Sequence, residues 1–182
     1  ETQQQIKATN SGQSTDSLAN SHTGSWSDDH ARPSAMAISL YDIPESIGPY
    51  RILGILGRGG MCIVYKAIHS ELGHLAALKV LQRNQSDENS QQRFITEAKL
   101  AASLDSHTHI VKVLDAGQAP NGAYMAMEVI DGTDLRALID KGKVKARPGA
   151  RVVADIAGAL AYAHENGIIH RDIKPANIMI DR

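Results

Sequence analysis

The sequence predicts an α+β fold, in which five strands and one helix are followed by a helical region. Three observations lead to this prediction. Five short apolar or β-branched runs lie within residues 50–130, with glycine or proline in several of the turns between them. One segment with apolar residues at three- and four-residue spacing follows the third run. Beyond residue 135 the periodicity becomes helical.

Composition limits the classes of function. The chain has 182 residues, and 42% of them are hydrophobic, which is enough for one globular core. Its 19 basic and 20 acidic residues nearly cancel, so no overall field attracts nucleic acid or an anionic membrane, and phosphate binding must be local. Cys62 is the single cysteine, which excludes an internal disulfide and favours a cytoplasmic location. We find no signal peptide or membrane span in the sequence.

Residues 1–39 are rich in Ser, Thr, Gln, Asn, His and Asp and lack a sustained apolar period, so we expect a disordered polar tail. Its hydroxyls could be phosphorylated and Trp26 could anchor a partner, but a solvated linker is the simpler interpretation. The chain begins with Glu1 and stops after a strand-like run at residues 178–180. We therefore expect it to be a piece of a longer protein.

The first three strands are expected at residues 50–56, 63–68 and 75–81. The glycines that separate the first two indicate a hairpin with a flexible turn. A helix is predicted over residues 90–104, because Phe94, Ala98, Ala101 and Leu104 form one apolar stripe.

Two further strands are predicted at residues 110–116 and 124–130, joined by the turn-forming Pro120, Asn121 and Gly122. A short helix is expected at residues 135–139 and a longer one at residues 150–165, ending before Asn166 and Gly167. The apolar face of the longer helix would consist of Val153, Ile156, Ala157, Leu160 and Ala163.

Three features of the sequence indicate possible chemistry: a glycine cluster, a lysine with a possible glutamate partner, and a polar segment at residues 170–177. Gly57, Gly59 and Gly60 lie between two strands, where a backbone without side chains can approach a phosphate. Taken alone, such a cluster in a hairpin is more often merely a flexible turn. Lys79 lies inside an apolar strand and could be a lysine whose head reaches solvent at a sheet edge. Glu97, beside the apolar stripe of the following helix, is a suitable counter-ion, and such a pair would hold the ammonium against nucleotide phosphates.

The most specific feature is residues 170–177, with the sequence His-Arg-Asp-Ile-Lys-Pro-Ala-Asn between two apolar runs. It offers a carboxylate for the proton of an attacking hydroxyl, a lysine for a migrating phosphoryl group and an amide oxygen for a metal ion.

Together these motifs resemble the protein kinase superfamily, and in particular the bacterial Hanks-type serine/threonine kinases. The resemblance implies a partial kinase domain over residues 48–182, with the small lobe at 48–127, the hinge region at 128–134 and the start of the large lobe at 135–182. The implied fold is the protein kinase fold: a five-stranded antiparallel small lobe with helix C, and the first helices of the large lobe.

The resemblance also implies a role for each matching residue. Asp172 would be the catalytic base, Lys174 would assist the γ-phosphate and Asn177 would bind Mg²⁺. The Lys79–Glu97 pair would mark the active state, and Arg171 would suit control by phosphorylation of an activation loop. The remaining residues implied in ATP binding are Leu56, Gly57, Arg58, Gly59, Gly60, Met61, Val64, Ala77, Met127, Glu128, Ile130 and Asp134. Met127 would be the gatekeeper, Glu128 to Ile130 the adenine-reading hinge, and Asp134 the ribose ligand.

One departure from the family pattern is Cys62, which replaces the third glycine of the loop. The implied function is transfer of the γ-phosphoryl group of ATP, with Mg²⁺, to Ser or Thr of protein substrates in signalling, and autophosphorylation in a dimer is possible. This piece lacks an Asp-Phe-Gly and an activation loop, so by itself it is expected to be inactive, and missing segments could anchor the whole protein to a membrane. The alternatives are a pseudokinase scaffold and, less favoured, a small-molecule kinase of the same fold. Nucleic acid is not an expected partner.

Overall fold

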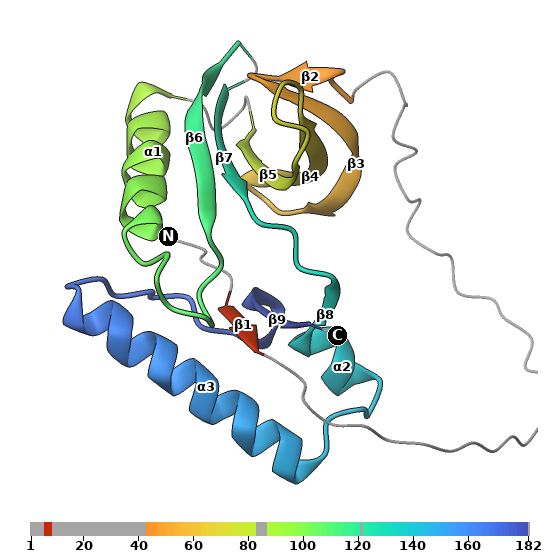
Figure 1. Cartoon of the computed structure of the whole chain (residues 1–182), viewed down its shortest axis with the longest axis vertical. Coiled ribbons are helices and arrows are strands. Elements are labelled where there is room, and N and C mark those ends of the chain that lie inside the picture. The colour runs from red at the N-terminus through yellow and green to blue at the C-terminus, as the bar shows by residue number, and fades with distance from the viewer. Residues whose placement is uncertain (1–5, 9–42, 83–86, 121, 182) are drawn as a thin grey trace, which may run out of the picture.

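The computed structural model describes residues 6–8, 43–82, 87–120 and 122–181. Figure 1 shows two parts: a strongly curled sheet with helix α1 beside it, and below it a region with helices α2 and α3 and the short strands β1, β8 and β9. The segment after β7 connects the two parts. Among the described residues, no helix combines the length and the apolar character needed to cross a bilayer.

The expected five-stranded antiparallel sheet is confirmed, with a short sixth strand at its edge. The strand order is β2-β3-β4-β5-β7-β6, and all neighbouring pairs are antiparallel. The strands span Ser46–Ile47 (β2), Tyr50–Arg58 (β3), Cys62–His69 (β4), Leu75–Leu81 (β5), Val113–Ala119 (β6) and Gly122–Met127 (β7). Asn121, in the predicted turn before β7, lies outside the described residues.

The two faces of this sheet bury different sets of side chains, because successive residues of a strand point to opposite faces. One face packs Tyr65, Leu78 and Ala126 into a core inside the curl. The other face packs Ala77, Met125 and Met127 against α1. The continuous apolar run of β5 is thus explained by burial on both faces.

Helix α1 spans Glu88–Ala102 and covers the second face of the sheet. Its amino end is capped by Asp87, whose carboxylate accepts a hydrogen bond from the Ser90 N–H at 2.6 Å. The predicted apolar stripe is confirmed, because Phe94, Ala98 and Ala101 are buried within the helix, and Leu104 just beyond it is also buried. The helix begins two residues before the predicted start.

The second part contains a three-stranded sheet in the order β1-β9-β8, formed by Ile6–Ala8, Ile178–Asp181 and Gly132–Asp134. Strand β8 was not predicted, since three residues are too few for a period to be recognised. Strand β1 pairs in parallel with β9. The expectation of a wholly disordered tail is therefore wrong for Ile6–Ala8, and the rest of residues 1–39 lies outside the described residues.

Helices α2 (Leu135–Asp140) and α3 (Ala146–Glu165) complete this part of the chain. Helix α3 begins four residues before the predicted start, because Pro148 falls in the first helical turn, where a missing N–H costs no helical hydrogen bond. The predicted apolar face is partly wrong. Ile156, Ala159 and Ala163 are buried against Leu104 and Ile178, whereas Val153 is 65% exposed.

Candidate functional site

One face of the main sheet brings together several of the residues that the sequence singled out. Gly57 on β3 pairs with Val64 on β4, and Val64 pairs with Lys79 on β5. Ala77, two residues before Lys79, pairs with Met127 on β7. Because paired residues project to the same side of a sheet, the side chains of Val64, Ala77, Lys79 and Met127 share one face, which is the face toward α1.

The glycine-rich hairpin is fixed by hydrogen bonds at its tip. The Gly59 N–H donates to the Cys62 carbonyl at 2.8 Å. Gln82, just after β5, makes two hydrogen bonds to the loop. Its backbone N–H donates to the Met61 carbonyl and its Nε2 donates to the Gly59 carbonyl, both at 2.9 Å. Leu56 and Met61 are exposed, at 52% and 57%, and Arg58 ends β3.

The glycines of this hairpin leave room above the backbone. A Cβ at Gly57 or Gly60 would meet no heavy atom within 4 Å, and one at Gly59 would be 3.5 Å from the Cys62 carbonyl. Neither Gly57, Gly59 nor Gly60 has a positive φ. The fold itself therefore does not demand glycine at these positions, whereas a group approaching the backbone closely would.

Cys62 begins β4 rather than occupying the loop tip, and its half-buried side chain packs on the cluster between the sheet and α1. Burial raises the pKa of the Cys62 thiol above its ordinary value, an effect that the Lys79 charge reduces and the Glu97 charge reinforces. A raised pKa leaves less thiolate at neutral pH. Cys62 is thus less prone to oxidation than a cysteine with an ordinary pKa.

Lys79 is the buried cation of the site, with 8% of its surface exposed. Burial lowers the pKa of its ammonium, while the charges of Cys62, Glu97 and Asp172 act in the opposite direction. Its Nζ also lies 5.8 Å from the centroid of the Phe94 ring on α1. Charged groups on a strand, on a helix and in the loop that contains Asp172 therefore all act on one ammonium group.

The segment after β7 begins with a well-anchored residue. The Glu128 N–H donates to the Lys112 carbonyl at 3.0 Å, and the Glu128 carboxylate accepts from the Lys112 N–H at 3.1 Å. This N–H is therefore occupied within the protein and cannot read an adenine. The described residues show no hydrogen bond of the Ile130 N–H, so the Glu128 carbonyl and the Ile130 N–H are the candidate hinge groups.

Asp134 caps helix α2. Its Oδ1 accepts a hydrogen bond from the Ala137 N–H at 2.8 Å, so one carboxylate oxygen serves the fold. Its strand, β8, pairs with β9, where Asp134 is opposite Met179. This pairing ties the end of the hinge region to the strand that follows Asn177. A contact of Asp134 with a ribose stays a prediction.

Asp172, Lys174 and Asn177 form a compact hydrogen-bonded group. The Asp172 Oδ2 accepts from Lys174 Nζ at 2.8 Å and from Asn177 Nδ2 at 3.0 Å. Asn177 Nδ2 also donates to the Asp172 carbonyl at 2.8 Å. Asn177 is 8% exposed and is held by the short 3₁₀ helix η3, Pro175–Asn177. Because its NH₂ group faces Asp172, its Oδ1 is the atom that can face a cation.

The backbone before Asp172 is held in an unusual conformation. Arg171 has a φ of 62°, in the left-handed region that residues with a side chain rarely adopt. The Asp172 N–H contacts both the His170 carbonyl, at 2.9 Å, and His170 Nδ1, at 3.2 Å. The buried His170 ring, 4% exposed, thus fixes the turn that presents the Asp172 carboxylate.

Sequence reasoning missed three residues that support this site. Phe94 had been assigned to the core alone, Gln82 lies in no motif, and Lys112 precedes a strand without a distinctive pattern. Each acts through a contact with a residue distant in sequence, so no local signal could have identified Gln82 or Lys112.

The family model and the curated relatives that match this chain both indicate protein kinases. A family model described as "Protein kinase domain" matches residues 50–182. Serine/threonine-protein kinase PknJ of Mycobacterium tuberculosis is 41% identical over 134 residues, which are 73% of this chain and 23% of PknJ. Serine/threonine-protein kinase PrkC of Bacillus subtilis is 39% identical over 136 residues, covering 74% of this chain and 21% of PrkC. The chain thus spans about a fifth of the length of these curated relatives.

Solved structures show the same fold. The crystal structure of the Mycobacterium tuberculosis PknI kinase domain matches with a TM-score of 0.64 and 31% identity, over 75% of this chain and 59% of that one. The structure titled "PpkA-294 apo form" matches with a TM-score of 0.65 and 26% identity, over 74% of this chain and 55% of that one.

Proposed function

The chain belongs to the protein kinase family, and on this premise we propose that it forms the nucleotide-binding part of an enzyme that transfers the γ-phosphoryl group of ATP to serine or threonine hydroxyls of proteins. The observation that supports this best concerns the buried ammonium of Lys79: burial lowers its pKa, and the charges of Glu97 and Asp172 both act on it in the opposite direction. The choice of serine or threonine is supported by the names of the relatives. It is also supported by Lys174-Pro175, which resembles the loop of the serine/threonine branch of the family.

In the proposed reaction Asp172 orients the acceptor hydroxyl and accepts its proton. The hydroxyl oxygen forms a bond to the γ-phosphorus while the bond from that phosphorus to the β,γ-bridging oxygen breaks, and ADP leaves. Lys174, already 2.8 Å from Asp172, would balance the charge of the moving phosphoryl group. Lys79 would hold the α- and β-phosphates, beneath the hairpin that contains Gly57, Gly59 and Gly60.

Mg²⁺, when bound, would neutralise the phosphate oxygens. The Asn177 Oδ1 fits it, since Mg²⁺ prefers oxygen ligands. Among the described residues, no group of three or more His, Cys, Asp or Glu side chains could hold a metal. Asn177 would therefore supply one ligand, beside the phosphates.

The direct test is Mg²⁺-dependent phosphotransfer by the gene product that contains this chain. Wild type, Asp172→Asn and Lys79→Met would be incubated with ATP and a generic protein substrate, and phosphorylated residues identified by mass spectrometry. Phosphoserine or phosphothreonine in the wild type alone is the expected result. Nucleotide binding without transfer by any of the three would indicate a nucleotide-binding scaffold instead.

A further inference from the structure

The connection between α2 and α3 carries a dense run of positive charge that the proposed catalysis does not use. Residues 141–151 contain five of the chain's 19 lysines and arginines and none of its 20 acidic residues. Four of the cations, Lys141, Lys143, Lys145 and Arg147, fall within residues 141–147, which we call the basic tip. All four are exposed.

The cations of the basic tip have no anionic partner among the described residues. The nearest acidic residue in sequence, Asp140, pairs with Arg136 through bonds of 2.8 and 3.0 Å. Within residues 43–82, 87–120 and 122–181, the structure shows no ion pair of Lys141, Lys143, Lys145 or Arg147. Their charge is therefore available to an external anion.

Helix α3 adds to the positive potential rather than balancing it. Its amino end follows Lys145, which provides no side-chain cap, and its first turn contains no acidic residue. The amino end of a helix carries a partial positive charge, which proteins commonly balance with an acidic residue or a capping side chain. Here the partial charge and the cations of the basic tip lie together.

The basic tip is held in place by its own backbone. The Lys141, Gly142 and Lys143 N–H groups donate to carbonyls of α2 at 2.9 to 3.2 Å. Gly142 has a φ of 63°, which allows the reversal of the chain. The lysines are therefore presented from an ordered turn, so less conformational entropy is lost when a partner binds.

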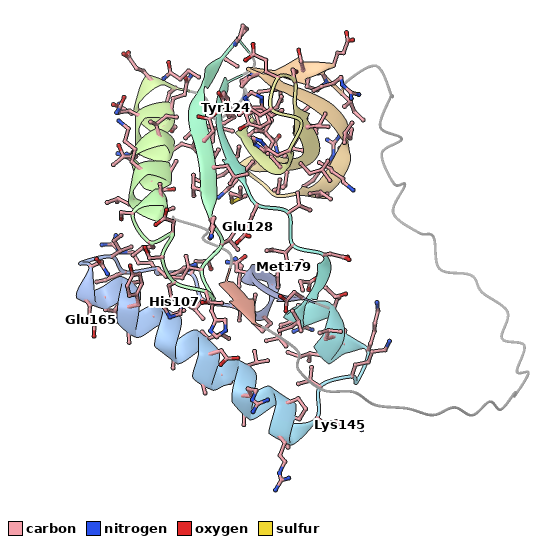
Figure 2. The ribbon with its side chains drawn as sticks, viewed as in Figure 1. His107, Tyr124, Glu128, Lys145, Glu165 and Met179 are labelled. Atoms are coloured by element: carbon pink, nitrogen blue, oxygen red, sulfur yellow. The ribbon has the colours of Figure 1, made fainter. Side chains whose placement is uncertain are left out.

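The shape of the basic tip selects among anionic partners. Figure 2 shows Lys145 at the end of α3 that lies farthest from the curled sheet, at an extremity of the structure. A hollow of about 290 Å³ lies elsewhere, on α1 beside Glu97. The aliphatic Val144, 37% exposed, lies between Lys143 and Lys145. A protruding, cationic tip with one aliphatic residue fits a flat anionic surface better than it fits a peptide, which would need a groove.

We propose that the basic tip docks this domain on the surface of a membrane rich in anionic lipid. Each lysine near such a surface strengthens binding roughly five-fold, and the effect is lost within a Debye length. Because Val144 is only partly exposed, electrostatics rather than insertion carries the attraction, and added salt weakens it. The proposal is independent of phosphotransfer, since neither Asp172 nor Lys79 takes part.

The test measures sedimentation of the purified chain with vesicles of phosphatidylcholine, with and without phosphatidylglycerol. Wild type is compared with Lys143→Gln/Lys145→Gln, and with the matched control Lys66→Gln/Lys99→Gln, which removes two exposed lysines from β4 and α1. We expect binding to the anionic vesicles only, reversed by salt, with about 25-fold weaker partitioning for the tip variant and a much smaller loss for the control. Far-UV circular dichroism checks that all three are equally folded.

Two results would overturn the proposal. An equal loss in both double variants would show that net charge, not the basic tip, drives the binding. Failure of the wild type to bind anionic vesicles at low salt would exclude a lipid surface. If the wild type then bound a polyglutamate peptide and the tip variant did not, the basic tip would be assigned to an acidic protein partner instead.

Discussion

The Nζ atom of Lys79 lies 5.8 Å from the centroid of the Phe94 ring, so the buried cation of β5 rests on a residue of α1. Phe94 is itself 6% exposed and belongs to the core between the sheet and this helix. The ring therefore has two functions: it packs the helix on the sheet, and it supports the ammonium that would hold the nucleotide.

Two substitutions at Phe94 separate these functions. Phe94→Ala should lower the free energy of unfolding by about 3–5 kcal/mol, because it leaves a cavity in the core. Phe94→Leu keeps most of the apolar volume, so it should fold but bind ATP several-fold more weakly, since the ring face is lost. Urea denaturation and nucleotide titration measure the two effects. Wild-type affinity in the leucine variant would show that the ring does not position Lys79.

Lys79→Met gives a prediction about pH. Burial lowers the pKa of Lys79 below its usual 10.5, so between its folded pKa and 10.5 the unfolded chain binds more protons than the folded one. The contribution of Lys79 to stability therefore rises with pH in this window. We expect Lys79→Met to be as stable as wild type or more stable at neutral pH, with the difference shrinking toward pH 10.

The measurement is the difference in free energy of unfolding between the two proteins at several pH values, in which groups common to both cancel. A difference that stays constant with pH would contradict the lowered pKa.

Asp172→Asn should abolish most phosphotransfer without unfolding the chain. A general base typically contributes about 10²–10⁴-fold in rate, so a loss of this size is expected in the whole gene product. The asparagine can still accept from Lys174 Nζ and Asn177 Nδ2, which preserves the local hydrogen bonds. The check is the rate of transfer together with the melting temperature, and a variant with wild-type rate would remove Asp172 from the role of base.

Cys62 should react slowly with alkylating agents. Because burial raises the pKa of its thiol, the native protein holds less thiolate at pH 7.5 than an unfolded chain does. Iodoacetamide labelling should therefore be slower in the native protein than in urea. Equal or faster labelling of the native protein would contradict the raised pKa. Cys62→Ser supplies the unlabelled control.

Two glycines offer a matched pair of alanine substitutions. A Cβ at Gly132 would collide with the Ile180 carbonyl on β9, whereas a Cβ on Gly158 in α3 would meet nothing within 4 Å. Gly132→Ala should destabilise the chain by about 1–3 kcal/mol, and Gly158→Ala should stabilise it by about 0.5–1 kcal/mol. Urea denaturation measures both. Equal effects would show that β8 and β9 do not pack this closely.

Much of the fold could be predicted because it follows from local patterns. The apolar runs of the five strands and the stripe from Phe94 to Leu104 are properties of neighbouring residues. The structure confirms them, although the strand expected at residues 110–116 spans Val113–Ala119. The start of α3 was misplaced, because Pro148 and Gly149 resemble a helix boundary although a proline is tolerated in the first turn. Strands β1 and β8 have three residues each and exist only through their pairing with β9.

The sequence by itself determined which chemical groups are candidates for the site, since Lys79, Asp172, Lys174 and Asn177 stand in motifs specific enough to assign the family. The tertiary structure decided which atoms meet. Three contacts join segments that are distant in sequence. The Phe94 ring lies against Lys79, Gln82 donates hydrogen bonds to the glycine-rich hairpin, and the Glu128 N–H donates to the Lys112 carbonyl. Such contacts depend on how loops close and cores pack, so they are properties of the whole fold rather than of any short run of residues.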